Sequence, residues 1–215
     1  MTRARTRREL VAGPAGAIEC AVDEPAGAPG GVARGVALVA HPHPLFGGTL
    51  DNKVAQTLAR AFVELGYAAW RPNFRGVGAS EGAHDEGRGE VDDLAAVLAH
   101  ARAARPVLAG FSFGAAVQTR LAQRLARAGN PPERMVLVGL AVKHLEAMAV
   151  PADTILIHGE EDTTVPLADV LAWARPQDLP VVVVPGADHF FHRRLNVLRA
   201  IVQNSWRGAP EAEGR

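Results

Sequence analysis

Three side chains in the sequence could together perform nucleophilic chemistry: Ser112, Asp162 and His189. Ser112 is the centre of Gly-Phe-Ser-Phe-Gly (residues 110–114), which follows a short apolar run and precedes a helix-forming segment. This order puts a serine hydroxyl on a tight strand-to-helix turn at the end of a sheet. The flanking glycines allow the close backbone approach that such a turn needs. The function that the sequence can reveal depends on whether Ser112 is a nucleophile.

A serine hydroxyl is a poor nucleophile near neutral pH and needs a base beside it. Histidine can accept the proton, and a carboxylate holds the imidazole in one tautomer and stabilises the imidazolium. Asp162 and His189 follow Ser112 in the chain, and each comes directly after an apolar strand. We therefore predict Ser112 as nucleophile, His189 as base and Asp162 as orienting acid. The alternative for Ser112 is a serine that merely caps a helix.

Other acids and histidines compete for these roles. Glu160 and Glu161 come before the end of their turn and are interpreted as solvated. Asp188 adjoins the proposed base in sequence, which directs its side chain elsewhere. His158 ends a strand and is interpreted as a packed or hydrogen-bonded histidine, whereas His192 is placed in the first turn of the final helix.

The elements that must position these residues are short apolar runs alternating with amphipathic helices. The predicted strands are 17–22, 32–40, 67–73, the run before Ser112, 135–142, 154–158 and 181–184. Asp51 or Asn52 can cap the helix that follows the second strand, and the closing helix is predicted to include Phe191. Such alternation predicts a mostly parallel sheet covered by helices on both faces. Reactive residues then collect at the carboxyl edge of the strands, where the loop beginning at His41 also lies.

Acyl transfer also needs N–H donors aimed at the oxyanion that develops on the substrate. The residue after the nucleophile, Phe113, should provide one, and the loop after strand 32–40 should provide the other. Pro42 and Pro44 have no N–H. The remaining donors of this loop are His43, Leu45 and Phe46. Leu45 is favoured because both prolines could hold its segment rigid.

Composition limits the classes of function. The chain has 215 residues, which favours a single domain over 1–215, and its ends, 1–8 and 208–215, are predicted to fray. Lys plus Arg equals Asp plus Glu, 23 against 23, so no global field attracts nucleic acid or an anionic membrane. The single cysteine, Cys20, excludes an internal disulfide and a cysteine-based metal cluster. We predict a cytoplasmic protein, monomer or homodimer, that contacts neither nucleic acid nor membrane.

Two patterns could indicate a metal or a cofactor. His41 and His43 have metal-ligand spacing, and Asp51 or His84 could approach them in space, but a loop-stabilising role is favoured for both histidines. The glycines in 76–82 follow a strand, yet Glu81 replaces the third glycine of a dinucleotide fingerprint. The sequence therefore predicts no metal and no cofactor.

Five segments together carry a resemblance to a known family. They are His-Pro-His-Pro-Leu-Phe-Gly-Gly-Thr (41–49), Asn-Phe-Arg-Gly-Val-Gly-Ala-Ser-Glu-Gly (73–82), the Ser112 turn, His-Gly-Glu-Glu-Asp (158–162) and Gly-Ala-Asp-His-Phe-Phe (186–191). The chain resembles an α/β-hydrolase over about 32–206, in a small bacterial lidless subgroup of the His-Pro-His-Pro type related to dienelactone hydrolases. Dienelactone hydrolases use a cysteine nucleophile, so Ser112 points to ester rather than lactone chemistry.

The length of one connection limits the substrate. Only Lys143 to Asp153 separates the sixth predicted strand from the seventh, too short for the helical cap that many such enzymes insert there. An open site does not bury a long acyl chain by itself, so we expect a small-molecule substrate, a short-chain or compact ester. Phe46, Phe111 and Phe190 are the predicted apolar wall. A thioesterase, peptidase or acyltransferase with the same triad is an alternative, as is a catalytically silent binding scaffold.

Overall fold

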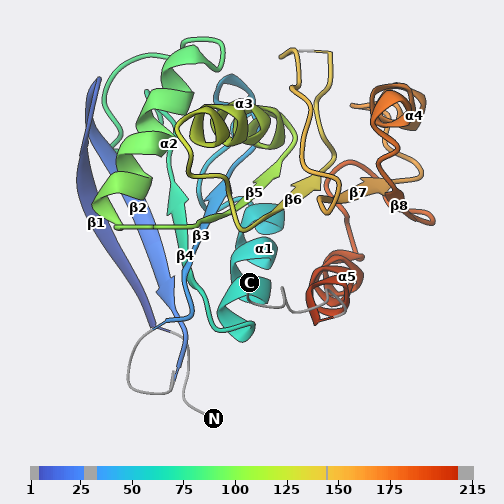
Figure 1. Ribbon diagram of the computed structural model, residues 1–215, viewed down its shortest axis with the longest axis horizontal. Coiled ribbons are helices and arrows are strands. Elements are labelled where there is room, and N and C mark those ends of the chain that lie inside the picture. The colour runs from blue at the N-terminus through green and yellow to red at the C-terminus, as the bar shows by residue number, and fades with distance from the viewer. Residues whose placement is uncertain (1–4, 27–32, 144, 208–215) are drawn as a thin grey trace.

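The computed structural model describes residues 5–26, 33–143 and 145–207, and its strands form one eight-stranded sheet. The sheet order is β1-β2-β4-β3-β5-β6-β7-β8, with parallel pairing from β4 to β8 (Figure 1). The strands are β1 Arg5–Gly13, β2 Gly16–Glu24, β3 Val36–Ala40, β4 Ala68–Pro72, β5 Val107–Phe111, β6 Arg134–Val138, β7 Ile155–Gly159 and β8 Val181–Val184. The predicted mostly parallel sheet is confirmed.

Helices cover both faces of this sheet, as predicted. Helices α2, α3 and α4 lie on one face and α1 and α5 on the other, each over its own apolar cluster (Figure 1). The α-helices are α1 Lys53–Glu64, α2 Arg88–His100, α3 Phe113–Arg127, α4 Leu167–Ala174 and α5 Leu195–Arg207, and the 3-10 helices are η2 Pro44–Phe46 and η3 Arg175–Gln177.

The ends of α1 show how local sequence sets these helices. The side chain of Asn52, rather than that of Asp51, is the N-cap, and its Oδ1 accepts the N–H groups of Val54 and Ala55 at 2.9 and 3.3 Å. Gly66 follows the helix with φ 91°, a conformation that glycine adopts without strain. The helix therefore leads the chain from the loop after β3 back to the start of β4.

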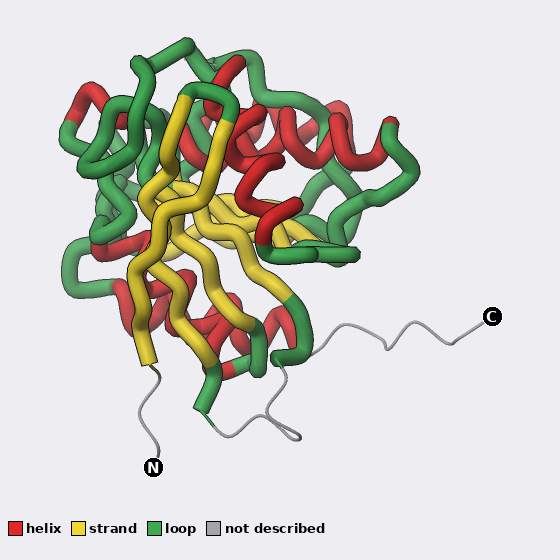
Figure 2. Tube along the Cα trace, turned by 90° about the vertical axis from the view of Figure 1, so that its left-hand side faces the viewer, coloured by secondary structure: helices red, strands yellow, loops and turns green. Residues whose placement is uncertain are grey.

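The prediction that residues 1–8 fray is wrong for residues 5–8. Those residues begin β1, which pairs antiparallel with β2 from Arg5 opposite Glu24 to Gly13 opposite Gly16, and this hairpin stands in front in Figure 2. The strand is hard to see in sequence because it forms the sheet edge and mostly faces solvent, with only Val11 buried. Residues 1–4 and the predicted frayed tail 208–215 lie outside the described residues.

The last helix begins later than predicted. Phe191 and His192 belong to a turn, and α5 starts at Leu195. Phe191 and Arg193 have φ values of 54° and 59°, which an α-helix does not accommodate. The Phe191 N–H instead donates to Asp188 O at 3.1 Å. The buried Phe191 ring still joins the core beneath α5, which explains why its spacing imitated the helix.

The connection from β6 to β7 contains no helix among its described residues, 139–143 and 145–154. It packs against its neighbours instead: Met148 N–H donates to Thr119 Oγ1 on α3, and Trp173 Nε1 on α4 donates to Ala147 O. The α/β-hydrolase fold without a lid, as predicted, is the fold of the chain.

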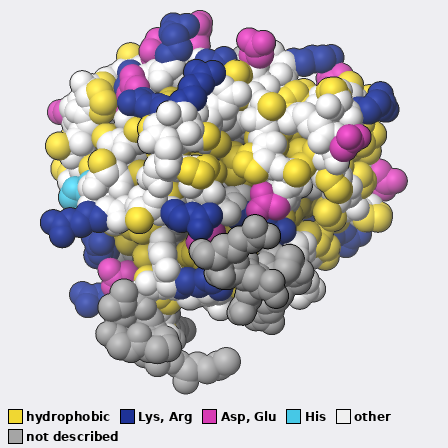
Figure 3. All heavy atoms as spheres, in the orientation of Figure 1, with side chains coloured by type: hydrophobic (Ala, Val, Ile, Leu, Met, Phe, Trp, Pro, Cys, Tyr) yellow, Lys and Arg dark blue, Asp and Glu magenta, His cyan; other side chains and the backbone are white. Residues whose placement is uncertain are grey.

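The surface and the helices bear on the charge and membrane predictions. On the face drawn in Figure 3, Lys and Arg side chains are interspersed with Asp and Glu side chains. Among the described helices, none is long and apolar enough to cross a bilayer.

Candidate active site

Ser112 lies at the junction of β5 and α3 with a strained backbone. Its φ of 56° and ψ of −118° are unfavourable for a residue with a Cβ, and such strain is found mainly at functional sites. The Ser112 N–H donates to Val138 O at the end of β6, 2.9 Å away. The junction is therefore held by a neighbouring strand as well as by its own helix.

The two glycines of the motif are required by space, as the sequence predicted. A Cβ on Gly110 would lie 2.6 Å from Ala115 N, and a Cβ on Gly114 would lie 2.3 Å from His41 O. Neither distance is compatible with a side chain. The first turn of α3 therefore lies directly against the end of β5 and the loop that follows β3.

The structure brings Ser112, His189 and Asp162 together from three strand ends. His189 Nε2 is 3.1 Å from Ser112 Oγ, and His189 Nδ1 is 2.7 Å from Asp162 Oδ2. Asp162 Oδ1 accepts the N–H groups of Thr164 and Val165 at 2.9 and 2.8 Å. With Nδ1 donating to the carboxylate, Nε2 of the neutral ring is left to accept the serine proton. The arrangement is that of a nucleophile, a base and an orienting acid.

Gly139, which the sequence reading did not single out, makes room for the base. A Cβ at this position would lie 3.3 Å from His189 Nδ1 and 3.2 Å from the Phe111 ring, and φ there is 53°. A glycine directly after an apolar strand was the available signal. The predicted strand 135–142 hid it, because β6 ends at Val138.

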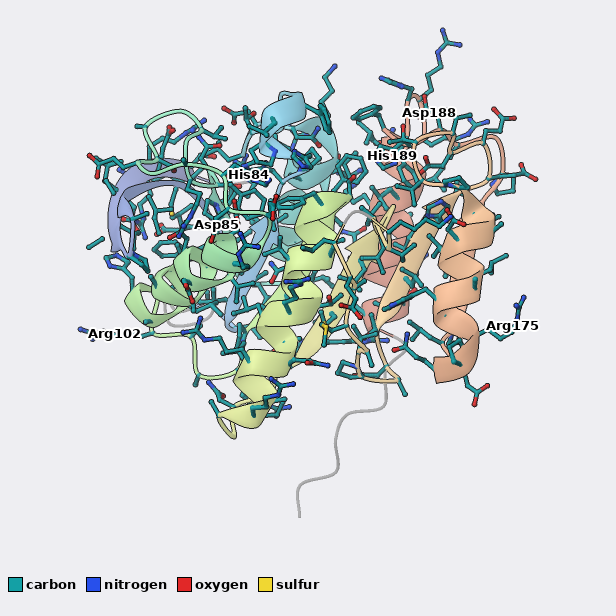
Figure 4. The ribbon with its side chains drawn as sticks, turned by 90° about the horizontal axis from the view of Figure 1, so that it is seen from above. His84, Asp85, Arg102, Arg175, Asp188 and His189 are labelled. Atoms are coloured by element: carbon teal, nitrogen blue, oxygen red, sulfur yellow. The ribbon has the colours of Figure 1, made fainter. Side chains whose placement is uncertain are left out.

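The competing acids have other partners. Asp188 accepts the His192 N–H at 3.0 Å and lies 2.6 Å from His192 Nδ1, and this pairing lowers the Asp188 pKa. Glu160 Oε2 accepts the Gly186 N–H at 2.9 Å. In Figure 4, His189 lies inward of Asp188 at the rim of the sheet. Both carboxylates thus shape the loop that carries the base.

His41 joins two loops at the same edge. Its ring is fully buried, Nδ1 lies 2.6 Å from Pro42 O, and Nε2 accepts the Phe74 N–H at 2.9 Å. Because a carbonyl faces Nδ1 and an N–H faces Nε2, the ring is the neutral Nδ1–H tautomer. Burial lowers the His41 pKa to about 4, which keeps that tautomer in place. The predicted loop-stabilising role fits this geometry.

Leu45 is already engaged by its own turn. Its N–H donates to His43 Nδ1 at 3.3 Å, where His43 caps η2, and its side chain is 69% exposed. The Phe46 N–H donates to His43 O at 3.1 Å. These hydrogen bonds count against Leu45 as an oxyanion donor. Phe113 does fit that role, since it is the first residue of α3 and the first N–H groups of a helix lack intrahelical acceptors.

The predicted apolar wall is only partly present. Phe46 is 84% exposed with its ring 4.7 Å from the His43 ring, and Phe190 is 45% exposed beside the His189 ring at 5.2 Å. Phe111 is the exception, because its side chain is fully buried in β5 and packs behind His189 at 4.7 Å. The prediction that Phe111 contacts substrate is therefore wrong; alternation along β5 points its ring into the core beneath α1 and α5.

Another imidazole–carboxylate pair flanks the serine turn. His84 Nδ1 lies 2.9 Å from Oε1 of the fully buried Glu90, without the alignment of a hydrogen bond, and its ring is 5.4 Å from the Phe113 ring. Figure 4 shows His84 and His189 on opposite sides of the N-terminal end of α3. No group of three or more His, Cys, Asp or Glu residues with metal-binding geometry occurs among the described residues.

The segment 73–82 has a structural role. Arg75 Nε and NH2 donate to the two carboxylate oxygens of Asp93 at 2.7 and 2.8 Å, tying this segment to α2. Ser80 Oγ donates to Asn73 O and accepts the Glu19 N–H from β2. The glycines here serve loop geometry, in agreement with the rejected dinucleotide interpretation.

Comparisons with known proteins agree with this geometry. No family model matches the chain. It is 34% identical to a protein of Xanthomonas campestris whose crystal structure is that of an α/β serine hydrolase without a lid, over 99% of each chain, with a TM-score of 0.85. It is 36% identical to an α/β serine hydrolase homologue of Coxiella burnetii over 94% of this chain and 99% of that one, with a TM-score of 0.80.

A curated relative extends the likeness to sequence alone. An uncharacterized protein of Rickettsia prowazekii is 32% identical over 184 residues, which cover 73% of this chain and 71% of that protein. The solved relatives match nearly the whole chain at more than 30% identity, and the serine of the tight turn stands in it with a histidine and an aspartate at hydrogen-bond distance. The chain therefore belongs to the α/β serine hydrolases and is a hydrolytic enzyme.

Proposed function

We propose that the enzyme hydrolyses carboxylic esters through an acyl-enzyme on Ser112. His189 Nε2 takes the Ser112 proton as Oγ attacks the ester carbonyl, and it then gives this proton to the leaving alcohol. Water attacks the acyl-enzyme by the same route and releases the acid. Asp162 holds the His189 tautomer and stabilises the imidazolium. The observation that carries the proposal is the continuous contact from Ser112 Oγ through His189 to Asp162, at 3.1 and 2.7 Å.

The oxyanion donors proposed are the N–H groups of Phe113 and His43. The Pro42 carbonyl faces His41 Nδ1, and in a trans peptide the N–H points opposite to the carbonyl. The His43 N–H is therefore directed away from the His41 ring. The His43 ring lies 4.7 Å from the Phe113 ring, beside the serine turn. These contacts favour His43 over Leu45, whose N–H donates to the His43 side chain.

The substrate proposed is a neutral ester with short or compact groups. Two exposed apolar rims flank the triad: Leu45 and Phe46 on η2, and Phe190 beside the base. Nearby basic groups are already paired, since Lys143 Nζ lies 2.8 Å from Asp169 Oδ1 and Arg75 is bound to Asp93. Apolar rims without an unpaired cation favour an uncharged ester, and the absence of a cap favours compact groups.

The finer family assignment is also proposed. The 41–49 segment forms a tight turn in which Gly48 N–H donates to His43 O at 3.0 Å, and a Cβ on Gly48 would lie 2.1 Å from Pro42 O. A turn with these steric needs supports membership in the lidless His-Pro-His-Pro subgroup related to dienelactone hydrolases.

Covalent labelling tests the nucleophile. A fluorophosphonate probe should modify wild-type protein at one serine, found by peptide mass spectrometry at Ser112, and should leave Ser112→Ala unlabelled. The matched control is Ser205→Ala, on α5, which should label like wild type. Labelling elsewhere, or activity retained by Ser112→Ala, would contradict the proposed function.

A series of p-nitrophenyl esters from acetate to palmitate tests the substrate. kcat/KM should be highest for the short acyl groups and should fall as the chain lengthens, because no cap is present to cover a long chain. A clear long-chain preference would overturn the substrate proposal. Adding a competing alcohol or amine separates hydrolysis from acyl transfer by the products formed.

A further inference from the structure

His158 lies next to the triad but has no part in the reaction as proposed. It is the penultimate residue of β7, and its side chain is fully buried. Its Nε2 is 2.9 Å from Val165 O and 3.5 Å from Asp162 Oδ2. The ring thus contacts both the acid and the end of the turn that presents the acid.

The partners of His158 fix its protonation. A carbonyl oxygen can only accept, so Nε2 carries the proton and donates to Val165 O. Burial is the main cause that lowers the His158 pKa, so the ring stays neutral and Nδ1 is a bare acceptor. Within the described part of the chain, His158 Nδ1 is buried without a hydrogen-bond partner.

That arrangement costs stability. A buried polar atom without a partner destabilises a fold by about 1–3 kcal/mol. A leucine or methionine would fill the core here without such an atom. Local violations of this kind are expected where a residue serves function rather than packing. The position therefore asks for a role that an apolar side chain could not fill.

The hydrogen bonds around Val165 suggest that role. The Val165 N–H donates to Asp162 Oδ1, and the Val165 carbonyl accepts from His158. The peptide groups on both sides of Val165 are thereby fixed, one to the acid and one to β7. The carboxylate of Asp162 is held so that Oδ2 faces His189 Nδ1 at 2.7 Å.

We propose that His158 is a positioning residue for the hydrolytic reaction: through Val165 it locks the 162–165 turn and hence the Asp162–His189 hydrogen bond. The inference rests on the proposed function, in which Asp162 orients the base. Loss of the lock should let the carboxylate shift while substrate binding remains intact, since His158 is sealed from the site mouth.

A pair of amide variants tests the proposal. The amide nitrogen of Gln in His158→Gln can occupy the place of Nε2 and donate to Val165 O, whereas that of Asn in His158→Asn falls short. We expect kcat of His158→Asn to fall about tenfold to a hundredfold, with KM within about twofold of wild type. His158→Gln should recover most of the lost rate. His100→Asn, at an exposed histidine on α2, should match wild type.

Proton NMR gives a readout independent of turnover. The His189 Nδ1–H bound to Asp162 should give a resonance far downfield in wild type and in His158→Gln, and it should broaden or disappear in His158→Asn at an unchanged melting temperature. Equal kcat and equal spectra for the two amide variants would overturn the proposal, as would equal losses in both. Failure of the proposed function would appear separately, as activity retained by Ser112→Ala.

Discussion

The two halves of the active site are built by different forces. On the serine side, β3, β5 and the first turn of α3 are pressed together so closely that Cβ atoms on Gly110 and Gly114 would overlap backbone atoms. On the acid–base side, the loops after β7 and β8 are shaped by side-chain hydrogen bonds from Asp162, Glu160 and Asp188.

This difference separates stability from chemistry. Close packing of backbone tolerates no added atom, so changes on the serine side should damage the fold. Hydrogen bonds can be replaced by groups of similar shape, so changes on the acid–base side should leave the fold intact and damage the reaction. Substitutions on each side can break or sharpen the distinction.

The largest effect is expected from Asp162→Asn on the acid–base side. The amide can keep the shape of the carboxylate, but it favours the wrong tautomer of His189. kcat should fall about 10⁴-fold, as for the analogous change in a serine protease triad. The melting temperature should stay close to that of wild type by circular dichroism. A variant that unfolds would show that this half is also held by packing.

Gly114→Ala on the serine side should act on stability. Its Cβ would lie 2.3 Å from His41 O, and backbone cannot yield as a flexible side chain can. We expect a loss of at least about 3 kcal/mol in the free energy of unfolding, measured by urea denaturation. Gly129→Ala is the control, because φ there is 77° in open space, and it should cost only about 1 kcal/mol. Equal losses in the two variants would remove the steric argument.

The smallest of these effects is pH-dependent and concerns His41. Its pKa is about 4 in the folded chain, lowered by burial, against 6.5 for an ordinary histidine. Between these values the unfolded chain binds more protons, so the stability from neutral His41 is complete above pH 6.5 and is lost as pH falls toward 4. Between pH 7.5 and pH 5 this loss should reach about 2 kcal/mol.

Chemical denaturation at both pH values checks this. His41→Gln can still accept the Phe74 N–H and does not titrate, so its loss of stability between the two pH values should be smaller by that amount. His100→Gln, at an exposed histidine, should behave as wild type. An identical pH dependence in wild type and His41→Gln would mean that the buried ring contributes nothing.

The same contrast explains how much the sequence could predict. Apolar runs and glycine spacing reflect steric demands, so the strands, the Ser112 turn and the need for Gly110 and Gly114 could be read directly. The meeting of Ser112, Asp162 and His189 followed from the rule that parallel strands end at one edge. The Asn52 cap, by contrast, was narrowed only to two neighbours.

Features set by individual hydrogen bonds or by exposure could not be read in this way. The N–H of Leu45 is used by the His43 side chain, and nothing in composition or periodicity signals which amide in a tight turn is already bound. The role inferred for His158 depends on the distance from its Nε2 to Val165 O. The edge strand β1 was missed because a mostly solvent-facing strand lacks apolar alternation.

The short β6–β7 connection has a kinetic consequence. Many hydrolases must swing a covering segment aside before substrate enters and again before product leaves, and such motions often limit turnover. Here the described residues between β6 and β7 pack against α3 and α4 rather than forming a mobile cover. The catalytic cycle then has no such opening step, so its slow step falls to acylation or deacylation at Ser112, and oil–water boundaries should give no burst of activation.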